Sequence, residues 1–241
     1  MTFNLNKALI PVDRGEAFPL RDYSTASGSV EVVFRDLEER LVREIDRSDI
    51  VLGCVAWLTN KRILEALARV QCCIIVQKED FLRPDVGEQK SHLRKCYDAL
   101  DISRCRWEMW HPLKETSAAG DPGIEGVRCV GNHNTNRAPA FPRAHHKFVV
   151  FGTRQQFPRQ PPEHCDVLGM AEIDAEFVFN RVWTGSFNFT QNAGHSLENA
   201  LIVNDARVTR AYLGEFAQVA ALSEPLDWES EWCAPEWRLG T

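Results

Sequence analysis

Apolar residues recur along the first half of the chain with two periods. Between residues 30 and 45 they stand three or four positions apart, with Glu and Arg between them, which predicts an amphipathic helix. Short unbroken apolar runs predict buried strands, and these runs alternate with further amphipathic segments. The strands are expected at 49–59, 72–77 and 105–111, and the helices at 60–70, with Asn60 as its cap, and at 87–100. This rhythm predicts an α/β sandwich with a mixed, largely parallel central sheet flanked by helices.

The second half of the chain begins with a segment that is rich in Gly, Pro, Asn and Ala, at 113–142, and this composition predicts a loop. Three apolar segments after it predict strands, and a long amphipathic segment predicts the last helix. The strands are expected at 143–151, 175–185 and 196–205, and the helix at 206–222. A tryptophan-rich tail ends the chain, and no internal repeat is visible.

Charge and composition narrow the classes of protein only slightly. The net charge is −6, which argues against indiscriminate coating of nucleic acid but leaves room for a local basic site. No apolar run approaches the length of a membrane span, and the N-terminal residues lack the pattern of a signal peptide, so a cytoplasmic protein is expected. The eight cysteines show no paired CxxC spacing, so reduced thiols and no metal site are expected.

The chemistry concentrates in two short motifs. In "RAHHKFVVF" a charged group opens an apolar strand, and strand alternation directs His145 and Lys147 to one side and His146 and Phe148 to the other. An imidazole beside an ammonium can attack a phosphate while neutralising its charge. The second motif, "TGSFNFTQNAGHSLENA", carries a glycine, hydrogen-bonding side chains and a carboxylate: Gly185, Ser186, Asn188 and Glu198.

Together, H-x-K, G-S-x-N and the trailing Glu-Asn resemble the signature of the phospholipase D superfamily. "GSFNFT" followed by "LENALIV" is similar to the form in its small bacterial endonucleases, and the resemblance spans about residues 29–220. It implies a metal-free and cofactor-free phosphodiester hydrolase with His145 as nucleophile. Lys147 and Asn188 would bind phosphate oxygens, with Ser186 assisting by hydrogen bonding and Gly185 allowing close approach. Glu198 would accept a hydrogen bond from the far ring nitrogen of His145.

The resemblance also implies a partner. Members of the superfamily need a second histidine as general acid, and this chain carries one copy of the motif, so a homodimer with a shared active site is expected. We expect the substrate to be nucleic acid, DNA in the first place. Some relatives act as nuclease subunits beside a separate ATPase chain in defence against foreign DNA, and this sequence has no P-loop of its own.

The domain division expected from this resemblance is an N-terminal extension at 1–28, one phospholipase D-like domain at 29–222 and the tail at 223–241. Residues 153–181 are expected to include an inserted hairpin or loop near the site. The superfamily's pattern places an Asp five residues after the lysine, where this chain has Gly152. Its substitute is expected among three acidic residues before the second motif: Asp166, Glu172 or Asp174.

The sequence leaves several interpretations open. Arg143, Arg154 and Arg181, with Arg159, either form a local phosphate-binding strip or are merely solvated. Two other functions compete with a nuclease. One is a phospholipid hydrolase or phosphatidyl transferase, for which no convincing membrane-binding segment is visible. The other is a catalytically decayed module that serves binding or assembly.

Overall fold

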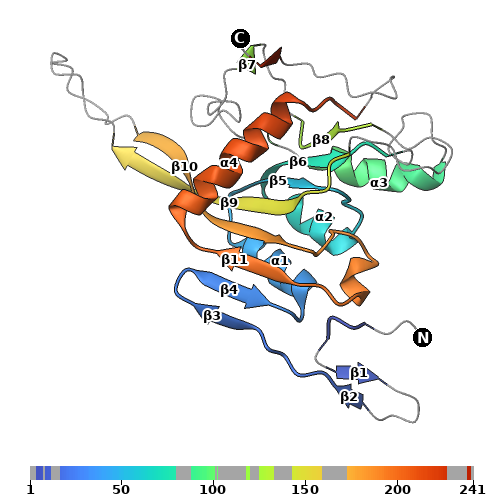
Figure 1. The fold of residues 1–241 in the computed structure, drawn as a ribbon. Coiled ribbons are helices and arrows are strands. Elements are labelled where there is room, and N and C mark those ends of the chain that lie inside the picture. The colour runs from blue at the N-terminus through green and yellow to red at the C-terminus, as the bar shows by residue number, and fades with distance from the viewer. Residues whose placement is uncertain are drawn as a thin grey trace.

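A computed structural model describes residues 4–7, 9–11, 17–79, 88–100, 102, 118–119, 125–132, 143–158, 173–226 and 238–239. Its main feature is an eight-stranded sheet with helices on both faces (Figure 1). The helices are α1 (Leu37–Asp46), α2 (Lys61–Leu67), α3 (Glu88–Asp98) and α4 (Ala206–Ala221), with a short 3₁₀ turn at Ala193–His195. This arrangement confirms the α/β sandwich expected from the sequence.

The strands of the large sheet run in the order β3-β4-β11-β10-β9-β5-β6-β8. Their bounds are β3 Thr25–Ser27, β4 Val30–Val33, β5 Ile50–Val55, β6 Gln71–Gln77, β8 Val127–Val130, β9 Lys147–Pro158, β10 Ile173–Gly185 and β11 Ala200–Val203. Two further small sheets pair β1 (Leu9–Pro11) with β2 (Ala17–Pro19) and β7 (Ala118–Ala119) with β12 (Arg238–Leu239).

The sheet is mixed, but the expectation that it is largely parallel is wrong. Only β5–β6 and β6–β8 are parallel, and all other neighbours are antiparallel. Parallel neighbours need a crossover connection, which α2 supplies between β5 and β6. The longest pairing, β9 with β10, is instead an antiparallel hairpin, and β11 and β4 continue that pattern.

Two apolar clusters fill the space between the sheet and its helices. On one face, α1 and α2 pack against alternate residues of the central strands, among them Val51, Ile74 and Trp183. On the other face α4 packs against the intervening residues of the same strands, such as Leu52 and Val150. Strands buried on both faces read as continuous apolar runs, which is why β5 and β6 stand out in the sequence.

Two local predictions are corrected. The expected helix from residue 30 begins only at Leu37, because Val30–Val33 forms β4 between β3 and β11. Within the predicted loop at 113–142, Val127–Val130 forms β8 beside β6. In contrast, Asn60 caps α2 as expected, since its side chain accepts from the backbone N–H groups of Arg62 and Ile63. The strand expected at 105–111 lies outside the described residues.

The segment at 153–181 extends the β9–β10 hairpin. Register pairs Thr184 with Phe148 at one end and Ile173 with Pro158 at the other, so the extension leads away from Lys147 rather than toward it (Figure 1). The paired strands of this segment therefore do not lie near the site, and for them the expectation of an insertion near the site is wrong. Asp174 lies in the distal part of β10, while Asp166 and Glu172 lie outside the described residues.

Gly152, which stands where the superfamily has Asp, lies inside the sheet. A Cβ at this position would come within 2.7 Å of Ile50 Cγ2 and of Phe179 Cε1, closer than real side chains approach. The backbone carbonyl of Gly152 accepts from Asp49 N at 2.9 Å, and Asp49 Oδ2 accepts from Arg154 N at 2.7 Å. An aspartate here would therefore require the side chains of Ile50 and Phe179 to shift.

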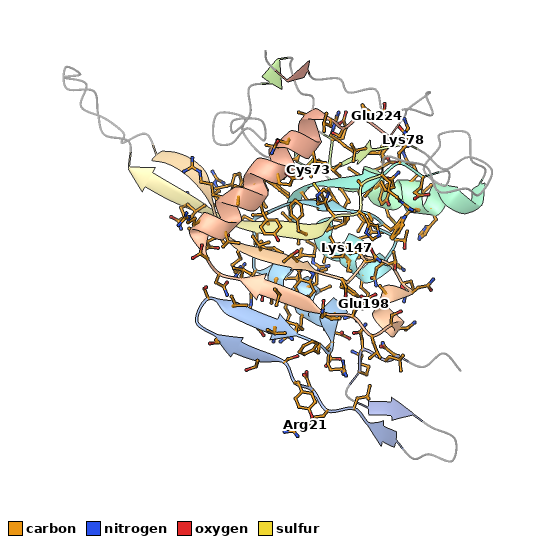
Figure 2. All side chains as sticks on the ribbon, in the orientation of Figure 1. Arg21, Cys73, Lys78, Lys147, Glu198 and Glu224 are labelled. Carbon is orange, nitrogen blue, oxygen red and sulfur yellow. The ribbon has the colours of Figure 1, made fainter. Side chains whose placement is uncertain are left out.

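The chain after α4 returns to the edge of the sheet. Glu224 exchanges two backbone hydrogen bonds with Cys129 of β8, and its carboxylate accepts from the ammonium of Lys78 in a buried ion pair (Figure 2). Arg128, also buried, donates to Ser223 Oγ at 2.7 Å and to Ser223 O at 3.0 Å. We call residues 223–226 the C-terminal clip. None of the described helices is long and apolar enough to cross a membrane.

Candidate active site

One end of the large sheet collects the residues of both motifs. Because β9 is antiparallel to β5 and to β10, its first residue, Lys147, lies at the same end as the last residues of those two strands. The register puts Gly185, at the end of β10, opposite Ala200, at the start of β11. Figure 2 shows Lys147 and Glu198 at this shared end. Segments far apart in the sequence therefore meet here.

His145 and Lys147 are in contact. His145 precedes β9 and is exposed, and Lys147 Nζ lies 3.1 Å from its Nδ1 and 3.3 Å from its Nε2. The ammonium also donates to the carbonyl of His145 at 3.1 Å. His146 points elsewhere, as strand alternation requires, with its ring 5.7 Å from that of Phe148 and its Nε2 3.4 Å from Glu215 Oε1.

The surroundings favour a neutral imidazole. Partial burial, together with the positive charges of Lys147 and Arg143 and the neighbouring His146, lowers the pKa of His145 below its ordinary value. Burial also lowers the pKa of Lys147, while the negative charge of Glu198 opposes this effect. The influence of Glu198 on Lys147 links the second motif to the first. A neutral imidazole has a free lone pair, which a nucleophile needs.

This electrostatic arrangement predicts a shift in a measurable titration. The NMR titration midpoint of His145 should lie below about 6.5, the ordinary value for histidine. Replacing Arg143 by glutamine removes a positive charge, so the midpoint should rise. If neutral His145 is the nucleophile, the acid limb of the rate profile should move to higher pH in the same variant, since protonation then begins earlier as the pH falls.

Arg154→Gln is the matched control for this titration, because Arg154 is an exposed arginine of β9, seven residues beyond Lys147. That control should leave the His145 midpoint where it is. A wild-type midpoint at or above 6.5, or one that Arg143→Gln does not move, would contradict the assignment of charges.

The second motif is held together by hydrogen bonds across the β10–β11 turn. Ser186 Oγ donates to Glu198 Oε2 and accepts from Asn199 N at 3.1 Å, while Ser186 N donates to Asn199 O at 3.1 Å. A Cβ on Gly185 would collide with Asn199 O and come within 2.7 Å of Ala200 Cα. Glycine is thus required for the close approach of two strands at this point.

In the described part of the chain, the ring nitrogens of His145 have a polar contact with Lys147 alone. The hydrogen bond expected between Glu198 and His145 is not formed in the single chain, where the Glu198 carboxylate accepts from Ser186.

Asn188 lies between two anchored aromatic residues. Phe187 and Phe189 are fully buried, and the carbonyl of Phe189 accepts from Thr59 N at 2.8 Å and from Asn60 N at 2.9 Å. The amide oxygen of Asn188 is buried and has no hydrogen-bond partner among the described residues. This oxygen can therefore accept from a further hydrogen-bond donor.

Of the four arginines expected in a strip, Arg159 lies outside the described residues, and the other three do not form one strip. Arg143 lies at the site, where its Cζ is 5.5 Å from the centre of the Trp57 ring. Arg181 is paired within the protein, with Nη1 3.4 Å from Glu44 Oε2 and Nη2 donating to Ser48 Oγ at 3.3 Å. Arg154 is roughly 20 Å from Lys147 at the rise of an extended strand. Nearness in sequence was misleading because β9 and β10 lead away from the site.

Sequence reasoning missed Trp57, Gln77 and Glu79. Trp57 Nε1 donates to Glu79 Oε1 at 3.2 Å, and the imidazole of His145 meets the indole edge-on with ring centres 5.5 Å apart. Gln77 Oε1 accepts from Ala144 N at 2.6 Å. The sequence does contain a signal for these residues. They are polar or aromatic and stand at or just after the ends of the buried parallel strands β5 and β6, and ligand sites often form at such strand ends. Among the described residues, no group of three His, Cys, Asp or Glu is arranged to hold a metal ion.

The fold and the site define an α/β sandwich with a histidine–lysine pair, a serine–carboxylate pair and an asparagine around one end of its sheet. No family model matches the chain. It is 30% identical over 223 residues to "Uncharacterized protein L381" of Acanthamoeba polyphaga mimivirus, a match that covers 85% of this chain and 70% of the viral protein. The chain therefore belongs to the same family as this viral protein.

Solved structures with similar folds include two bacterial proteins. The first is described as a phospholipase D family member, Nuc from Salmonella typhimurium, with 17% identity, a TM-score of 0.45 and coverage of 84% of this chain and 99% of that one. The second is NucT from Helicobacter pylori, with 12% identity, a TM-score of 0.45 and coverage of 78% and 95%. At such identities the function must be inferred from the side chains of this chain.

Proposed function

We propose that this protein is a phosphodiesterase, a metal-independent DNA endonuclease that acts through a phosphohistidine intermediate. The observation that carries the proposal is the contact of the His145 ring with Lys147 Nζ at the sheet end where the second motif also lies. The motif resemblance to small endonucleases of the phospholipase D superfamily favours DNA over lipid as substrate. Arg143, beside the pair, adds a further positive charge for a phosphate backbone.

In the first step, a ring nitrogen of His145 uses its lone pair to attack the phosphorus, and the bond from phosphorus to the leaving oxygen breaks. Lys147 Nζ lies within 3.3 Å of both ring nitrogens, and a neutral imidazole offers it one lone pair, so an incoming phosphate must draw the ammonium away from that nitrogen before attack. Lys147 and the side-chain amide of Asn188 then bind the phosphate oxygens on which negative charge accumulates. Ser186 assists when its hydroxyl proton turns from the Glu198 carboxylate to a phosphate oxygen.

The leaving oxygen needs a proton as its bond to phosphorus breaks. In the proposed homodimer, the same histidine of a second copy supplies this proton as general acid. In the second step that histidine takes a proton from water, the water oxygen attacks phosphorus, and the bond between phosphorus and His145 breaks. This step releases a phosphomonoester and regenerates the free enzyme. The partnership with a separate ATPase chain in defence against foreign DNA stays a prediction of the sequence.

The test is plasmid cleavage by purified protein in excess chelator. The wild-type protein should nick DNA under these conditions, and Lys147→Met should reduce the rate roughly 100- to 1,000-fold, the scale for loss of one group that stabilises transition-state charge. Lys61→Met is a suitable control, since this exposed lysine of α2 pairs only loosely with Glu65, at 3.6 Å.

The alternatives give different outcomes in the same preparation. Hydrolysis of phosphatidylcholine or cardiolipin vesicles without DNA cleavage would replace the nuclease by a phospholipase. A folded protein that cleaves neither diester would replace it by a binding or assembly module. Cleavage that Lys147→Met leaves intact would place the activity at another site.

A further inference from the structure

The indole of Trp57 joins three side chains at the site. Trp57 comes two residues after β5 ends, and its ring is nearly perpendicular to that of His145, at 82°, with centres 5.5 Å apart. The guanidinium of Arg143 lies over the indole at 5.5 Å. The ring N–H donates to Glu79 Oε1 at 3.2 Å, and the same oxygen is 3.6 Å from Arg143 Nη2. One buried carboxylate therefore holds both the indole and the arginine.

The backbone around His145 is fixed separately from its ring. On one side Ala144 N donates to Gln77 Oε1 at 2.6 Å, and on the other the carbonyl of His146 accepts from Ala56 N at 2.8 Å. These bonds tie the main chain of the loop to the ends of β6 and β5. They leave the imidazole free to rotate about its side-chain bonds.

Two neighbours restrain the imidazole: Lys147 by its ammonium and Trp57 by its ring. In the proposed reaction Lys147 turns to the phosphate, so its hold on the imidazole is lost when attack begins. The edge-to-face contact with Trp57 does not depend on the ammonium and persists. A nucleophile must approach within a near-attack geometry, and small misplacements slow the reaction strongly.

We propose that Trp57, anchored by Glu79, is a positioning residue that holds the ring of His145 in line for attack on phosphorus. The proposal rests on the proposed function for its catalytic meaning. A role as a stacking platform for a DNA base fits less well, because Arg143 already covers the indole and Glu79 fixes its edge.

The kinetic test measures DNA cleavage by three variants under both steady-state and single-turnover conditions. Trp57→Leu should lower the rate constant roughly 10- to 100-fold with little change in KM, since the ring contact that orients the nucleophile is lost. Trp57→Phe keeps an aromatic ring against His145 and should restore most of the rate. Glu79→Gln retains an acceptor for the indole N–H, so its loss should be smaller than that of Trp57→Leu.

A spectroscopic test addresses the contact without any activity. The imidazole protons of His145 lie beside the indole, so their NMR resonances should move in Trp57→Leu and stay near the wild-type positions in Trp57→Phe. Tyr23→Leu is the matched control, because Tyr23 is an exposed aromatic residue with an arginine, Arg21, over its ring at 4.8 Å. Arg21 lies well apart from Lys147 (Figure 2). That variant should change neither the spectrum of His145 nor the rate.

The outcomes separate this proposal from the proposed function. Unchanged His145 resonances in Trp57→Leu would overturn the positioning role, whether or not the protein cleaves DNA. A raised KM at constant kcat would overturn it in favour of a substrate platform. If the wild-type protein cleaves no diester, the proposed function fails, while resonances that move in Trp57→Leu and recover in Trp57→Phe would still support the hold of the indole on the imidazole.

Discussion

Replacing His145 by alanine should lower the rate of DNA cleavage by roughly 10,000-fold or more, the scale seen when an enzyme loses its nucleophile. Neither neighbouring group can take over the attack, because Lys147 is the charged partner of the imidazole and His146 faces Phe148 and Glu215. A gel assay with supercoiled plasmid in chelator measures the rate. The variant should remain folded, since His145 is exposed and its backbone is held by bonds at Ala144 and His146.

His146→Gln is the matched control, since it changes the adjacent histidine and should cleave at close to the wild-type rate. An acid-labile phosphoryl group should be trapped on the wild-type protein and not on His145→Ala. If two histidines from two copies share one site, mixing His145→Ala subunits into the dimer should suppress activity more steeply than the loss of wild-type subunits alone. A linear loss would argue for independent sites, and rapid cleavage by His145→Ala would end the phosphohistidine mechanism.

The second large effect concerns stability. Replacing Glu224 by leucine should lower the free energy of unfolding by about 3–5 kcal/mol, because the buried ion pair between the ammonium of Lys78 and the carboxylate of Glu224 is broken. Glu224 is itself almost wholly buried, in the C-terminal clip beside β8. Chemical denaturation followed by far-UV circular dichroism measures the change. Glu65→Leu, which breaks an exposed pair with Lys61, should cost less than about 1 kcal/mol.

A double variant distinguishes a charge effect from a packing effect. Lys78→Met together with Glu224→Leu removes both charges and should recover much of the stability lost in Glu224→Leu alone, because apolar residues of similar size can replace a buried ion pair. Equal losses in the single and double variants would show instead that the clip depends on the shape of Glu224.

The fold was predictable where burial alone sets the pattern. Strands β5 and β6 are buried on both faces, so their sequences are continuous apolar runs. The start of α2 is predictable from its capping residue, Asn60. Strand β4 was not predictable, because the apolar spacing of Val30–Val33 suits a helix as well as a strand and pairing with β11, far along the chain, decides between them. The direction of neighbouring strands depends on the same distant pairings.

The candidate site divides in a similar way. His145 and Lys147, like Ser186 and Glu198, are close in sequence or share a recognisable spacing, so the motifs identify them. Their grouping with Trp57 and Glu79 depends on strand order. The end of β5 lies beside the start of β9, and the end of β6 lies beside the end of β5. Arg154 and Arg181 are near the motifs in sequence, which predicts that they belong to the site. In the structure, the long β9–β10 hairpin places them away from it.

The packing of Gly152 between Ile50 and Phe179 bears on how other such proteins are recognised. A search pattern that insists on an acidic residue five positions after the lysine would pass over every protein built in this manner. A pattern that allows a glycine there, and asks for a bulky apolar partner on each neighbouring strand, would retrieve them. Retrieved sequences that keep the histidine and lysine would then be candidates for the same chemistry.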